Sequence, residues 1–172
     1  EQRDKSYTGI FVVAVKSTGI FCKPGCPART PLAKNVEYFA SNREALFAGY
    51  RPCKRCRPMD ATDQAPELIT KLVALVDHDV TRRMKDADLR ALSIDPSTAR
   101  RQFLRHYGMT FHAYHRARRL GTALASVRNG TAIHNSGYDA GFSSVSGFRD
   151  AFQKLFGTLP SNGKELPVVH GK

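Results

Sequence analysis

The sequence predicts a small mixed α+β domain followed by an all-α domain, and three observations support this division. All four cysteines of the 172-residue chain lie before Arg57. Beyond Pro66 the hydrophobic residues recur at helical spacing. In addition, a helical segment that begins at Ser97 recurs 49 residues further on. We therefore expect a first domain over residues 1–61, a linker over 62–66, a second domain over 67–161 and a tail over 162–172.

The composition favours a polyanionic partner. The chain carries 27 Lys and Arg against 15 Asp and Glu, with a formal net charge of +12 at pH 7 and a pI near 9.9. Such an excess favours a nucleic acid, although a solvated surface would give the same count, and charge alone does not separate DNA, RNA and an anionic membrane. The chain has no run of about 18 apolar residues and no signal-peptide pattern, so we expect a soluble, cytoplasmic protein that does not enter a membrane.

Short strands are predicted near the N-terminus. Residues 9–15 are rich in β-branched and aromatic side chains, and residues 16–19 (Lys-Ser-Thr-Gly) suit a turn. A β-hairpin with residues 20–22 is therefore expected. Residues 35–39 are a further strand candidate.

A short helix is predicted directly after these strands. Ser41 and Glu44 have the spacing of a capping box, and Gly49 is suited to end a helix over residues 42–48. A domain built from so few elements has a thin hydrophobic core.

The four cysteines have the spacing of a metal site. Cys22 and Cys26 form a C-x3-C pair, Cys53 and Cys56 form a C-x2-C pair, and 26 residues separate the pairs. Each short pair can present two sulfurs to one tetrahedral ion, while the long interval folds back to close the site. In a reducing cytosol, cysteines grouped in this way hold a metal more often than they form disulfides. We therefore expect one Zn2+ ion, bound by all four cysteines, to supply much of the stability of this domain.

A four-sulfur site is usually structural, but two features of this one favour a chemical role. Basic residues flank the cysteines in the sequence: Lys23, Arg29, Lys34, Arg51, Lys54, Arg55 and Arg57. Zinc also keeps all four sulfurs as thiolates at neutral pH, so the cluster has a formal charge of about −2 and its sulfurs stay nucleophilic. An anionic nucleophile on a cationic surface can meet a nucleic-acid backbone, although an ordinary phosphate repels it.

Three stretches around the cysteines, "FVVAVKSTGIFCKPGCPAR", "NVEYF" and "EALFAGYRPCKRCRP", resemble the amino-terminal zinc domain of the Ada family, the bacterial proteins of the adaptive response to DNA alkylation. The resemblance covers residues 7–58. It implies that Cys22 takes a methyl group from a methylphosphotriester in the DNA backbone, a role that spacing alone does not assign to one cysteine. It also implies that four basic residues hold neighbouring phosphates: Arg29, Arg51, Lys54 and Arg55. Thr18 is implied to lie beside the reacting site.

The implied chemistry fits these residue types. Methylation neutralises one phosphate, so the anionic cluster can approach that lesion while intact diesters keep it away. The thiolate then attacks the methyl carbon, and the restored diester leaves as a stable anion. The thioether product is not reversed, so each molecule should react once. Loss of one thiolate takes the cluster from about −2 to about −1, which should raise its affinity for DNA and let the repair act as a signal.

The second domain opens with an amphipathic helix and contains an internal repeat. Leu68, Leu72, Leu75 and Val76 fall on one apolar face. At an offset of 49 residues, "STARRQFLRHYGMTF" superposes on "SGFRDAFQKLFGTLP", and each copy is an amphipathic helix that ends at a glycine. The aromatic residues of the copies are expected in the core: Phe103, Tyr107, Phe148 and Phe152. Four histidines are expected on helix surfaces without a chemical role: His106, His112, His115 and His134.

Each copy follows a short helix and a turn, over residues 86–96 and 131–144. Helix, tight turn and helix, occurring twice on a basic chain, predict two helix-turn-helix units. Residues 112–128 between them form a helix long enough to set two recognition helices one duplex turn (~34 Å) apart.

Residues 67–161 resemble the DNA-binding domains of the AraC/XylS family, best in "GYDAGFSSVSGFRDAFQKLFG". The first copy departs from the family pattern where "DADLRALSID" precedes the turn. The resemblance implies DNA contacts from Ser97, Thr98, Arg100, Arg101 and Arg105 in the first copy, and from Ser143, Ser144, Ser146, Gly147 and Arg149 in the second. An arginine in this position can reach a guanine edge or a phosphate, and the sequence does not decide between them.

These features predict an α+β zinc domain followed by an all-α domain with two helix-turn-helix units joined by a long helix. The leading hypothesis is a stoichiometric methylphosphotriester-DNA–protein-cysteine S-methyltransferase that, once methylated, binds double-stranded promoter DNA as an activator of the alkylation response. We expect a monomer, with RNA polymerase as a further partner. The alternative is an AraC-type transcription factor with a purely structural zinc domain. An RNA-binding zinc protein is a weaker hypothesis, because paired helix-turn-helix units suit the major groove of B-form DNA.

Overall fold

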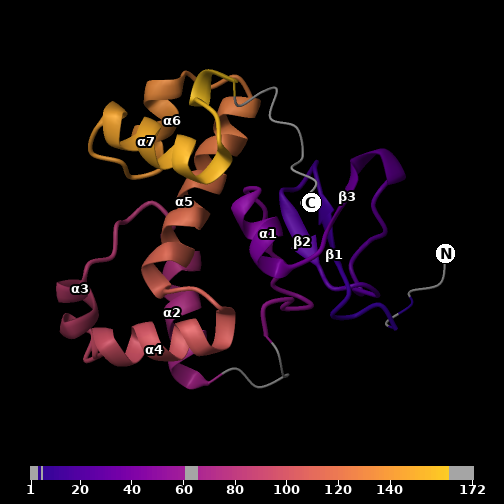
Figure 1. Ribbon diagram of the computed structural model, residues 1–172, viewed down its shortest axis with the longest axis horizontal. Helices are drawn as coiled ribbons and strands as arrows, with labels where there is room; N and C mark the ends of the chain where they lie inside the picture. The colour runs from indigo at the N-terminus through magenta and orange to yellow at the C-terminus, as the bar shows by residue number, and fades with distance from the viewer. Residues whose placement is uncertain (1–3, 5, 61–65, 163–172) are drawn as a thin grey trace.

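The structure, a computed structural model, describes residues 4, 6–60 and 66–162 of the chain. A small sheet with one helix lies beside a group of six further helices (Figure 1). Apart from Pro66, the predicted linker lies outside the described residues, and so does the predicted tail beyond Asn162. In the described part of the chain, no helix has the length and apolar character needed to cross a bilayer.

The N-terminal half forms a four-stranded sheet in the order β3-β1-β2-β4. Its strands are β1 (Val12–Val15), β2 (Ile20–Cys22), β3 (Val36–Phe39) and β4 (Arg51–Pro52). β1 pairs antiparallel with β2 and β3, so the predicted hairpin is confirmed. β4 pairs in parallel with β2. The sequence did not reveal β4, because two residues, one of them a proline, carry no strand pattern.

α1 (Asn42–Phe47) follows β3 and is capped by the predicted residues. The Ser41 hydroxyl accepts a hydrogen bond from the Glu44 N–H at 3.1 Å. The Glu44 carboxylate reaches one residue further back than a capping box requires, because it accepts from the N–H of Ala40 at 3.1 Å. Gly49, with φ at +93°, then turns the chain towards β4 in a conformation that favours glycine.

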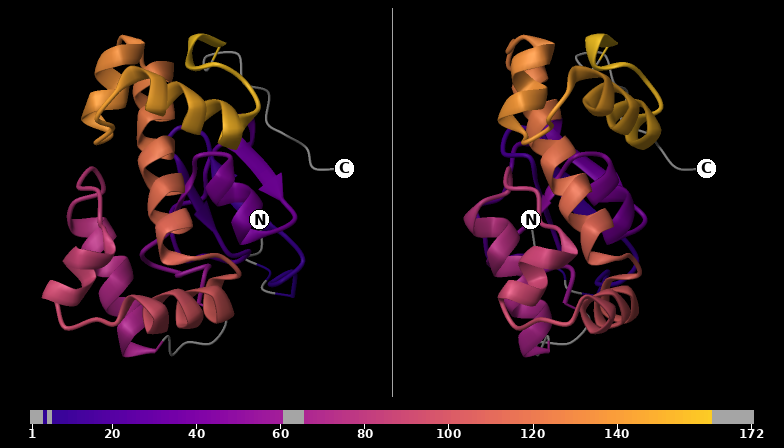
Figure 2. Two further views of the ribbon diagram at one scale, coloured as in Figure 1. Left: turned by 60° about the vertical axis from the view of Figure 1, so that its left-hand side comes forward. Right: turned by 90° about the vertical axis from the view of Figure 1, so that its left-hand side faces the viewer.

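The helical half contains the two predicted helix-turn-helix units. Its helices are α2 (Glu67–His78), α3 (Asp86–Ala91), α4 (Pro96–Tyr107), α5 (Phe111–Arg128), α6 (Ile133–Asp139) and α7 (Val145–Phe156). α3 and α4 form the first unit, α6 and α7 form the second, and α5 joins them. α4 and α7 lie at opposite ends of α5, and both begin on the side away from the sheet (Figures 1 and 2).

The two recognition helices begin and end in the same manner. At the start of α4, Asp95 accepts a hydrogen bond from a backbone amide at 2.7 Å, and Ser144 does the same for α7 at 3.2 Å. α4 ends at Gly108 and α7 at Gly157, both in the left-handed conformation. The repeat in the sequence therefore reflects a repeat of caps as well as of apolar positions.

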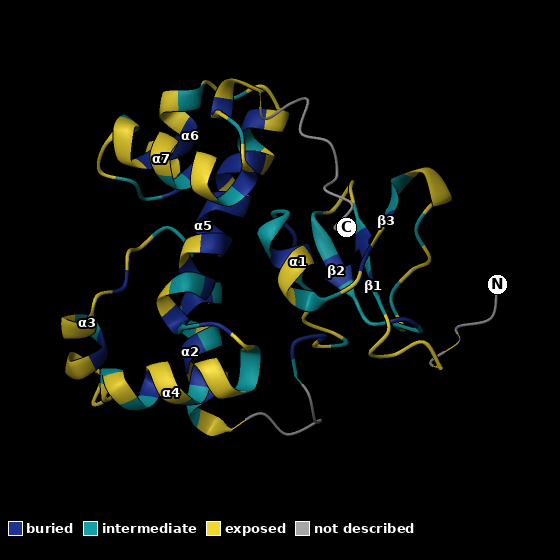
Figure 3. Cartoon of the chain, in the orientation of Figure 1, coloured by how far each residue is buried: buried dark blue, intermediate teal, exposed yellow. Residues whose placement is uncertain are grey.

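The sheet and the first helix-turn-helix unit share one hydrophobic core (Figure 3). Phe21 and Leu46 of the N-terminal half are fully buried in the same cluster as Ile69, Phe103 and Tyr114 of the helical half. The thin core expected of the first domain is thus extended by α2, α4 and α5. A second cluster packs α7 on the far end of α5, with the members Leu120, Ala123, Leu124, Ala140, Phe148, Phe152 and Phe156.

Two further contacts join the sheet half to the helical half. α1 packs against α5 where Gly49 meets Gly121, and a Cβ atom on Gly121 would lie 2.6 Å from the Gly49 carbonyl oxygen. The Tyr107 hydroxyl, at the end of α4, donates to Asp60 Oδ1 at 3.0 Å. At the glycine contact the two backbones touch with no side chain between them.

One expectation about the histidines is wrong. His112 and His134 are exposed and His106 is half-buried, but His115 is only 3% exposed. Its Nε2 atom lies 3.2 Å from the carbonyl oxygen of Val80. Burial lowers the pKa of His115 to about 4, so the ring is neutral at pH 7.

The apolar face of α2 is rotated slightly from the predicted one. Ile69, Leu72 and Val76 are fully buried, whereas Leu68 and Leu75 are half-buried. Both sets recur at helical spacing, so the choice between them depends on where the sheet and α4 cover the helix. That position is set by distant parts of the chain and leaves no local pattern.

Candidate metal centre and nucleic-acid interface

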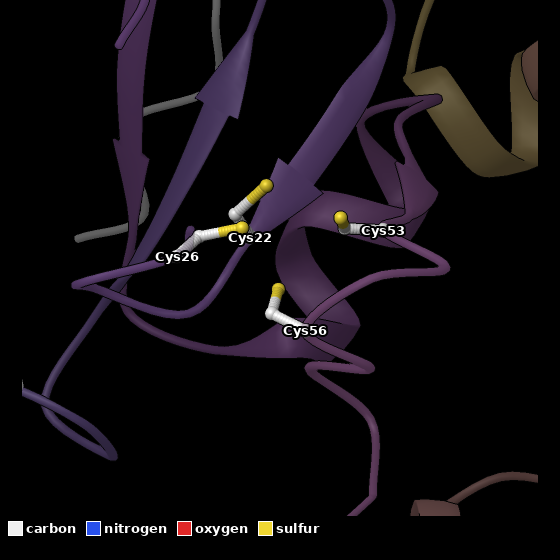
Figure 4. A group of neighbouring side chains, drawn as sticks. All are labelled: Cys22, Cys26, Cys53 and Cys56. Atoms are coloured by element: carbon white, nitrogen blue, oxygen red, sulfur yellow. The ribbon is translucent and has the colours of Figure 1, made fainter. Parts of the chain in front are cut away.

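Two segments of the chain bring the four cysteines together. Cys22 is the last residue of β2, and Cys53 comes directly after β4. Because β2 and β4 run in parallel, the two cysteines emerge side by side, and the Cys53 N–H donates to the Phe21 carbonyl at 2.9 Å. Turns then bring Cys26 and Cys56 back to them. The four Sγ atoms lie within 4.8 Å of one another (Figure 4).

The four sulfurs fit one tetrahedral zinc ion. Zinc–sulfur bonds of about 2.3 Å place the sulfurs of a tetrahedral site about 3.8 Å apart. A cluster whose sulfurs all lie within 4.8 Å of one another is consistent with this spacing. Cys53 is buried, whereas Cys22, Cys26 and Cys56 are half-buried. The site therefore has the ligands of a four-cysteine Zn2+ centre, as the spacing predicted.

The sulfurs perturb one another's ionisation. A hydrogen bond from the Cys22 thiol lowers the pKa of Cys56 to about 5, and the same hydrogen bond raises the pKa of Cys22. Burial raises the pKa of Cys26. Four thiolates in such close contact repel one another, so a divalent cation at their centre is what allows all four to ionise at neutral pH.

Hydrogen bonds that span the long interval hold the two cysteine turns together. The Lys23 N–H donates to Cys56 Sγ at 3.4 Å, and its ammonium group donates to the Asp60 carbonyl at 3.2 Å. Arg55 donates to the Pro27 carbonyl at 3.3 Å. The shape of the cluster is therefore supported by the surrounding chain as well as by its ligands.

The predicted phosphate-contact residues of the first half lie on three segments. Thr18 is exposed in the turn between β1 and β2, and that turn accepts a backbone hydrogen bond from Arg51 at 2.8 Å. Lys54 and Arg55 are exposed between the cysteines of the C-x2-C pair. Arg29 is exposed in the loop that follows the C-x3-C pair. The hydrogen bond from Arg51 to the Gly19 carbonyl thus brings the turn that contains Thr18 against the start of β4. Lys54 and Arg55 lie in a cysteine turn, and Arg29 lies just after the other.

One of these cations is held by the helical half. Lys54 Nζ lies 3.5 Å from Asp77 Oδ2 on α2, and Asp77 Oδ1 accepts a hydrogen bond from Arg118 of α5 at 2.8 Å. Arg118 is nearly buried and also donates to the Tyr114 hydroxyl at 2.8 Å. The sequence did not reveal Asp77 or Arg118, because a lone aspartate and a lone arginine 41 residues apart form no motif. To reach a phosphate, Lys54 has to leave Asp77.

The residues predicted to read DNA lie on the recognition helices and at their starts. In the first unit Thr98 is half-buried and the others are exposed: Ser97, Arg100, Arg101 and Arg105. In the second unit all are exposed: Ser143, Ser144, Ser146, Gly147 and Arg149. The Ser144 hydroxyl caps α7, so its lone pair is engaged by the backbone.

The helical half has the fold of AraC-type regulators. A solved structure of a probable AraC family transcriptional regulator from Rhodopseudomonas palustris CGA009 matches 58% of this chain and 96% of that one, with a TM-score of 0.51 at 20% sequence identity. This likeness concerns the fold alone. The family described as a helix-turn-helix domain matches residues 89–165. Fold and site together define a class: a four-cysteine zinc domain followed by a double helix-turn-helix domain of AraC type.

Sequence relatives define the family. The metal binding domain of Ada matches residues 1–59. The bifunctional transcriptional activator/DNA repair enzyme Ada of Escherichia coli (strain K12) is 37% identical over 167 residues, which cover 95% of this chain and 46% of that protein. The bifunctional transcriptional activator/DNA repair enzyme AdaA of Bacillus subtilis (strain 168) is 30% identical over 165 residues, which cover 95% of this chain and 78% of that protein. The chain thus spans about half the length of the first relative and about four-fifths of the second. It belongs to the Ada family.

Proposed function

We propose that this protein repairs methylphosphotriesters in DNA by transferring the methyl group to its own Cys22, and that the methylated protein regulates transcription. The observation that carries the first part is the position of Cys22, half-buried in a cluster of four sulfurs whose turns carry the exposed cations Arg29, Lys54 and Arg55. The relatives in E. coli and B. subtilis are named as both activators and DNA repair enzymes, which supports the combination.

The transfer is a single displacement at carbon. When bound, zinc keeps the sulfurs ionised at neutral pH and so removes the need for a general base. Cys22 Sγ attacks the methyl carbon, the sulfur–carbon bond forms as the carbon–oxygen bond breaks, and the electron pair of that bond goes to the phosphate oxygen. The products are a methyl thioether and an intact diester anion. A thioether is a poor leaving group, so each protein molecule reacts once.

The charges of the site explain how a methylated phosphate is chosen. Neighbouring intact phosphates are held by Arg29, Arg51, Lys54 and Arg55, with Thr18 beside the reacting group. The cluster itself has a formal charge of about −2 and repels an ionised diester, whereas a neutral triester can approach the sulfur. Selection is therefore made by repulsion of the wrong substrate as well as by attraction of the right one.

Methylation of Cys22 also changes the electrostatic repulsion between the whole protein and DNA. Loss of one thiolate lowers the formal negative charge of the cluster to about −1, so less repulsion opposes association with DNA. The exposed residues of α4 and α7 then contact the major groove of a promoter. We further propose that the protein acts as a monomer in the cytoplasm and activates transcription through RNA polymerase.

Mass mapping tests the repair function. The protein is incubated with duplex DNA that carries labelled methylphosphotriesters and is then digested. We expect one methyl group per molecule, located on Cys22 by fragment-ion sequencing, because Cys26 lies on the same short peptide, and none on Cys26, Cys53 or Cys56. Cys22→Ala should accept no methyl group, and Arg51→Ala, which keeps all four ligands, should react more slowly while binding zinc normally. A methyl group on another cysteine, or none on zinc-loaded wild-type protein, would overturn the proposal.

A regulator with a purely structural zinc centre is the second candidate. It is favoured by the internal contacts of two predicted phosphate-binding residues, since Lys54 pairs with Asp77 and Arg55 bonds to the chain between the cysteine pairs. In that case the wild-type protein gains no methyl group, and DNA affinity is the same before and after exposure to alkylated DNA.

A further inference from the structure

An open cavity of about 330 Å³ lies between the two helix-turn-helix units and contains none of the predicted DNA-reading residues. Its lining comes from the segment that leads into α3, from the first residue of α3 and from one face of α5. The residues are Arg83, Met84, Lys85, Asp86, His112, His115, Arg116 and Arg119. In Figure 1 the segment between α2 and α3 runs along the side of the molecule on which α4 and α7 begin.

The lining is strongly cationic. It has four basic side chains, from Arg and Lys, and one carboxylate, that of Asp86, which shares a hydrogen bond of 2.8 Å with His112 Nε2. Among the residues that the structure describes, no carboxylate forms an ion pair with Arg83, Arg116 or Arg119. Burial lowers the pKa of Arg119, and the charges of Arg83 and Arg116 lower it further. The cations therefore repel one another, and a bound anion would relieve this repulsion.

The wall of the cavity is rigid and connects both units. Arg119 is only 6% exposed, and its guanidinium donates to the carbonyls of Ala140 and Gly141 in the turn of the second unit and lies over the ring of Phe142. Gly141 in turn lies against the backbone of Thr81, where a Cβ atom would clash with the carbonyl oxygen. The cavity thus has a fixed position relative to α4 at one end of α5 and α7 at the other.

This position lies where a bound duplex would pass. The starts of the recognition helices enter the major groove in helix-turn-helix proteins, and α4 and α7 both begin on the side of the molecule along which the segment between α2 and α3 runs. A duplex that offers successive major grooves to the two helices carries its sugar–phosphate backbone across the space between them. Arg83, Lys85 and Arg116 are exposed towards solvent at this point.

We propose that the cavity binds a phosphate of the DNA backbone between the two recognition helices. This site rests on the proposed function as a DNA-binding regulator and adds a contact outside both helix-turn-helix surfaces. The bound group is a phosphate, and the position of the cavity between α4 and α7 favours a backbone diester over free phosphate. Because backbone contacts carry no base information, the site adds affinity and fixes register without adding sequence preference.

Salt dependence tests the site. A duplex selected by the wild-type protein from a random library is titrated with wild type, with the Arg83→Ala/Arg116→Ala variant and with Arg128→Ala. Arg128 is exposed at the end of α5 and does not line the cavity, so it is the matched control. We expect the double variant to bind roughly tenfold more weakly and to lower the slope of log K against log salt by about 0.9, the change expected when one phosphate contact is lost. An effect no larger than that of Arg128→Ala overturns the proposal.

DNA in which single phosphates are replaced by uncharged analogues tests whether the cavity binds the DNA backbone. Methylphosphonates, which have no transferable methyl group, are placed one at a time between the two major grooves. At one or two positions they should weaken wild type but not the Arg83→Ala/Arg116→Ala variant. Saturable binding of inorganic phosphate to the wild-type cavity, with equal methylphosphonate effects on both proteins, would assign the site to a free anion instead. Methyl transfer to Cys22 should be the same in both proteins, so a failed phosphate site is distinguished from a failed repair function.

Discussion

The two helix-turn-helix units have the same outline but different surroundings. Phe103 of α4 is buried in a cluster that includes Phe21 and Leu46 of the sheet half, and Tyr107 at the end of α4 bonds to Asp60. Phe148 of α7 is buried in a smaller cluster made only by α5 and the second unit. A repeat in the sequence therefore does not imply equal dependence on the rest of the protein. The first unit shares its core with the zinc-bearing half, whereas the second packs mainly on α5, with Leu155 of α7 also packed against the first cluster.

Their recognition helices also differ in charge. α4 carries Arg100, Arg101 and Arg105, whereas α7 carries Arg149 and Lys154 offset by Asp150. Backbone contacts depend on such cations, so the first unit has the larger capacity to hold phosphates. The unit that shares its core with the zinc half is also the one whose recognition helix carries the larger positive charge.

The largest expected loss of stability comes from removing a buried phenylalanine in either of the two hydrophobic clusters. Phe103→Ala and Phe148→Ala should each lower the free energy of unfolding by about 3–5 kcal/mol, because each leaves a cavity in a packed cluster. Phe103→Ala should also release zinc at lower urea concentration, whereas Phe148→Ala should unfold the second unit and leave the metal site intact. Urea denaturation with a coloured zinc chelator measures both events. Leu104→Ala, which is half-exposed beside Phe103, is the control. Equal zinc release in the two phenylalanine variants would show that the zinc site does not depend more on the first unit than on the second.

A smaller effect is expected from the ion pairs between the halves. Asp77→Asn leaves the nearly buried Arg118 without its carboxylate and should cost about 2–3 kcal/mol, less than for a fully buried pair because Asp77 is partly exposed. Lys54→Ala removes only an exposed partner of the same carboxylate and should cost about 0–1 kcal/mol. Denaturation at low and high salt measures both, and hydrogen exchange in α7 should be unchanged. Equal costs for the two substitutions would show that Arg118 does not depend on Asp77.

Gly121→Ala tests the backbone contact. The added Cβ would lie 2.6 Å from the Gly49 carbonyl oxygen, so the two halves have to separate slightly. We expect a loss of about 1–3 kcal/mol in the free energy of unfolding and faster hydrogen exchange in α1. Thr122→Ala, at an exposed neighbouring position, should have little effect. An unchanged exchange rate in α1 would show that the contact between Gly49 and Gly121 tolerates an added methyl group.

The smallest expected effect is a difference in pH dependence between the cap of α4 (Asp95) and the cap of α7 (Ser144). Hydrogen bonds from the side chain and amide of Thr98 lower the pKa of Asp95, so this cap contributes stability above about pH 4 and loses it as the pH falls through the lowered value. The Ser144 cap does not titrate in this range, and Ser144→Ala should cost about 1 kcal/mol at any pH. Amide NMR shifts of Thr98 and Gly147, followed in one sample during acidification, compare them. Asp95→Asn keeps an acceptor and should abolish the transition at Thr98.

Local patterns predicted much of the fold. The cap at Ser41, the glycines that end α4 and α7, and the burial of Phe103 and Phe148 all follow from residue spacing and type. The spacing of the four cysteines likewise predicted that their sulfurs meet in one metal site. These features depend on neighbours within a few turns of the chain or on a metal-ligand spacing, so the sequence contains them directly.

Features that depend on distant segments were not visible. The two-residue strand β4, the burial of His115 against the segment after α2, and the pairing of Asp77 with Arg118 each require the fold to be known. The cationic cavity is a further case, because its residues come from two separate stretches. The domain boundaries and the DNA-contact residues stay predictions.

The contact between Gly49 and Gly121 determines how a movement of the sheet half is transmitted. Side chains between two elements can change rotamer and absorb a small shift, but two backbones in direct contact cannot. In the proposed function, a rotation of the sheet half on DNA would therefore act directly on α5, which has a recognition helix at each of its ends. A methylphosphotriester held by the zinc half would in this way alter how both recognition helices meet a duplex.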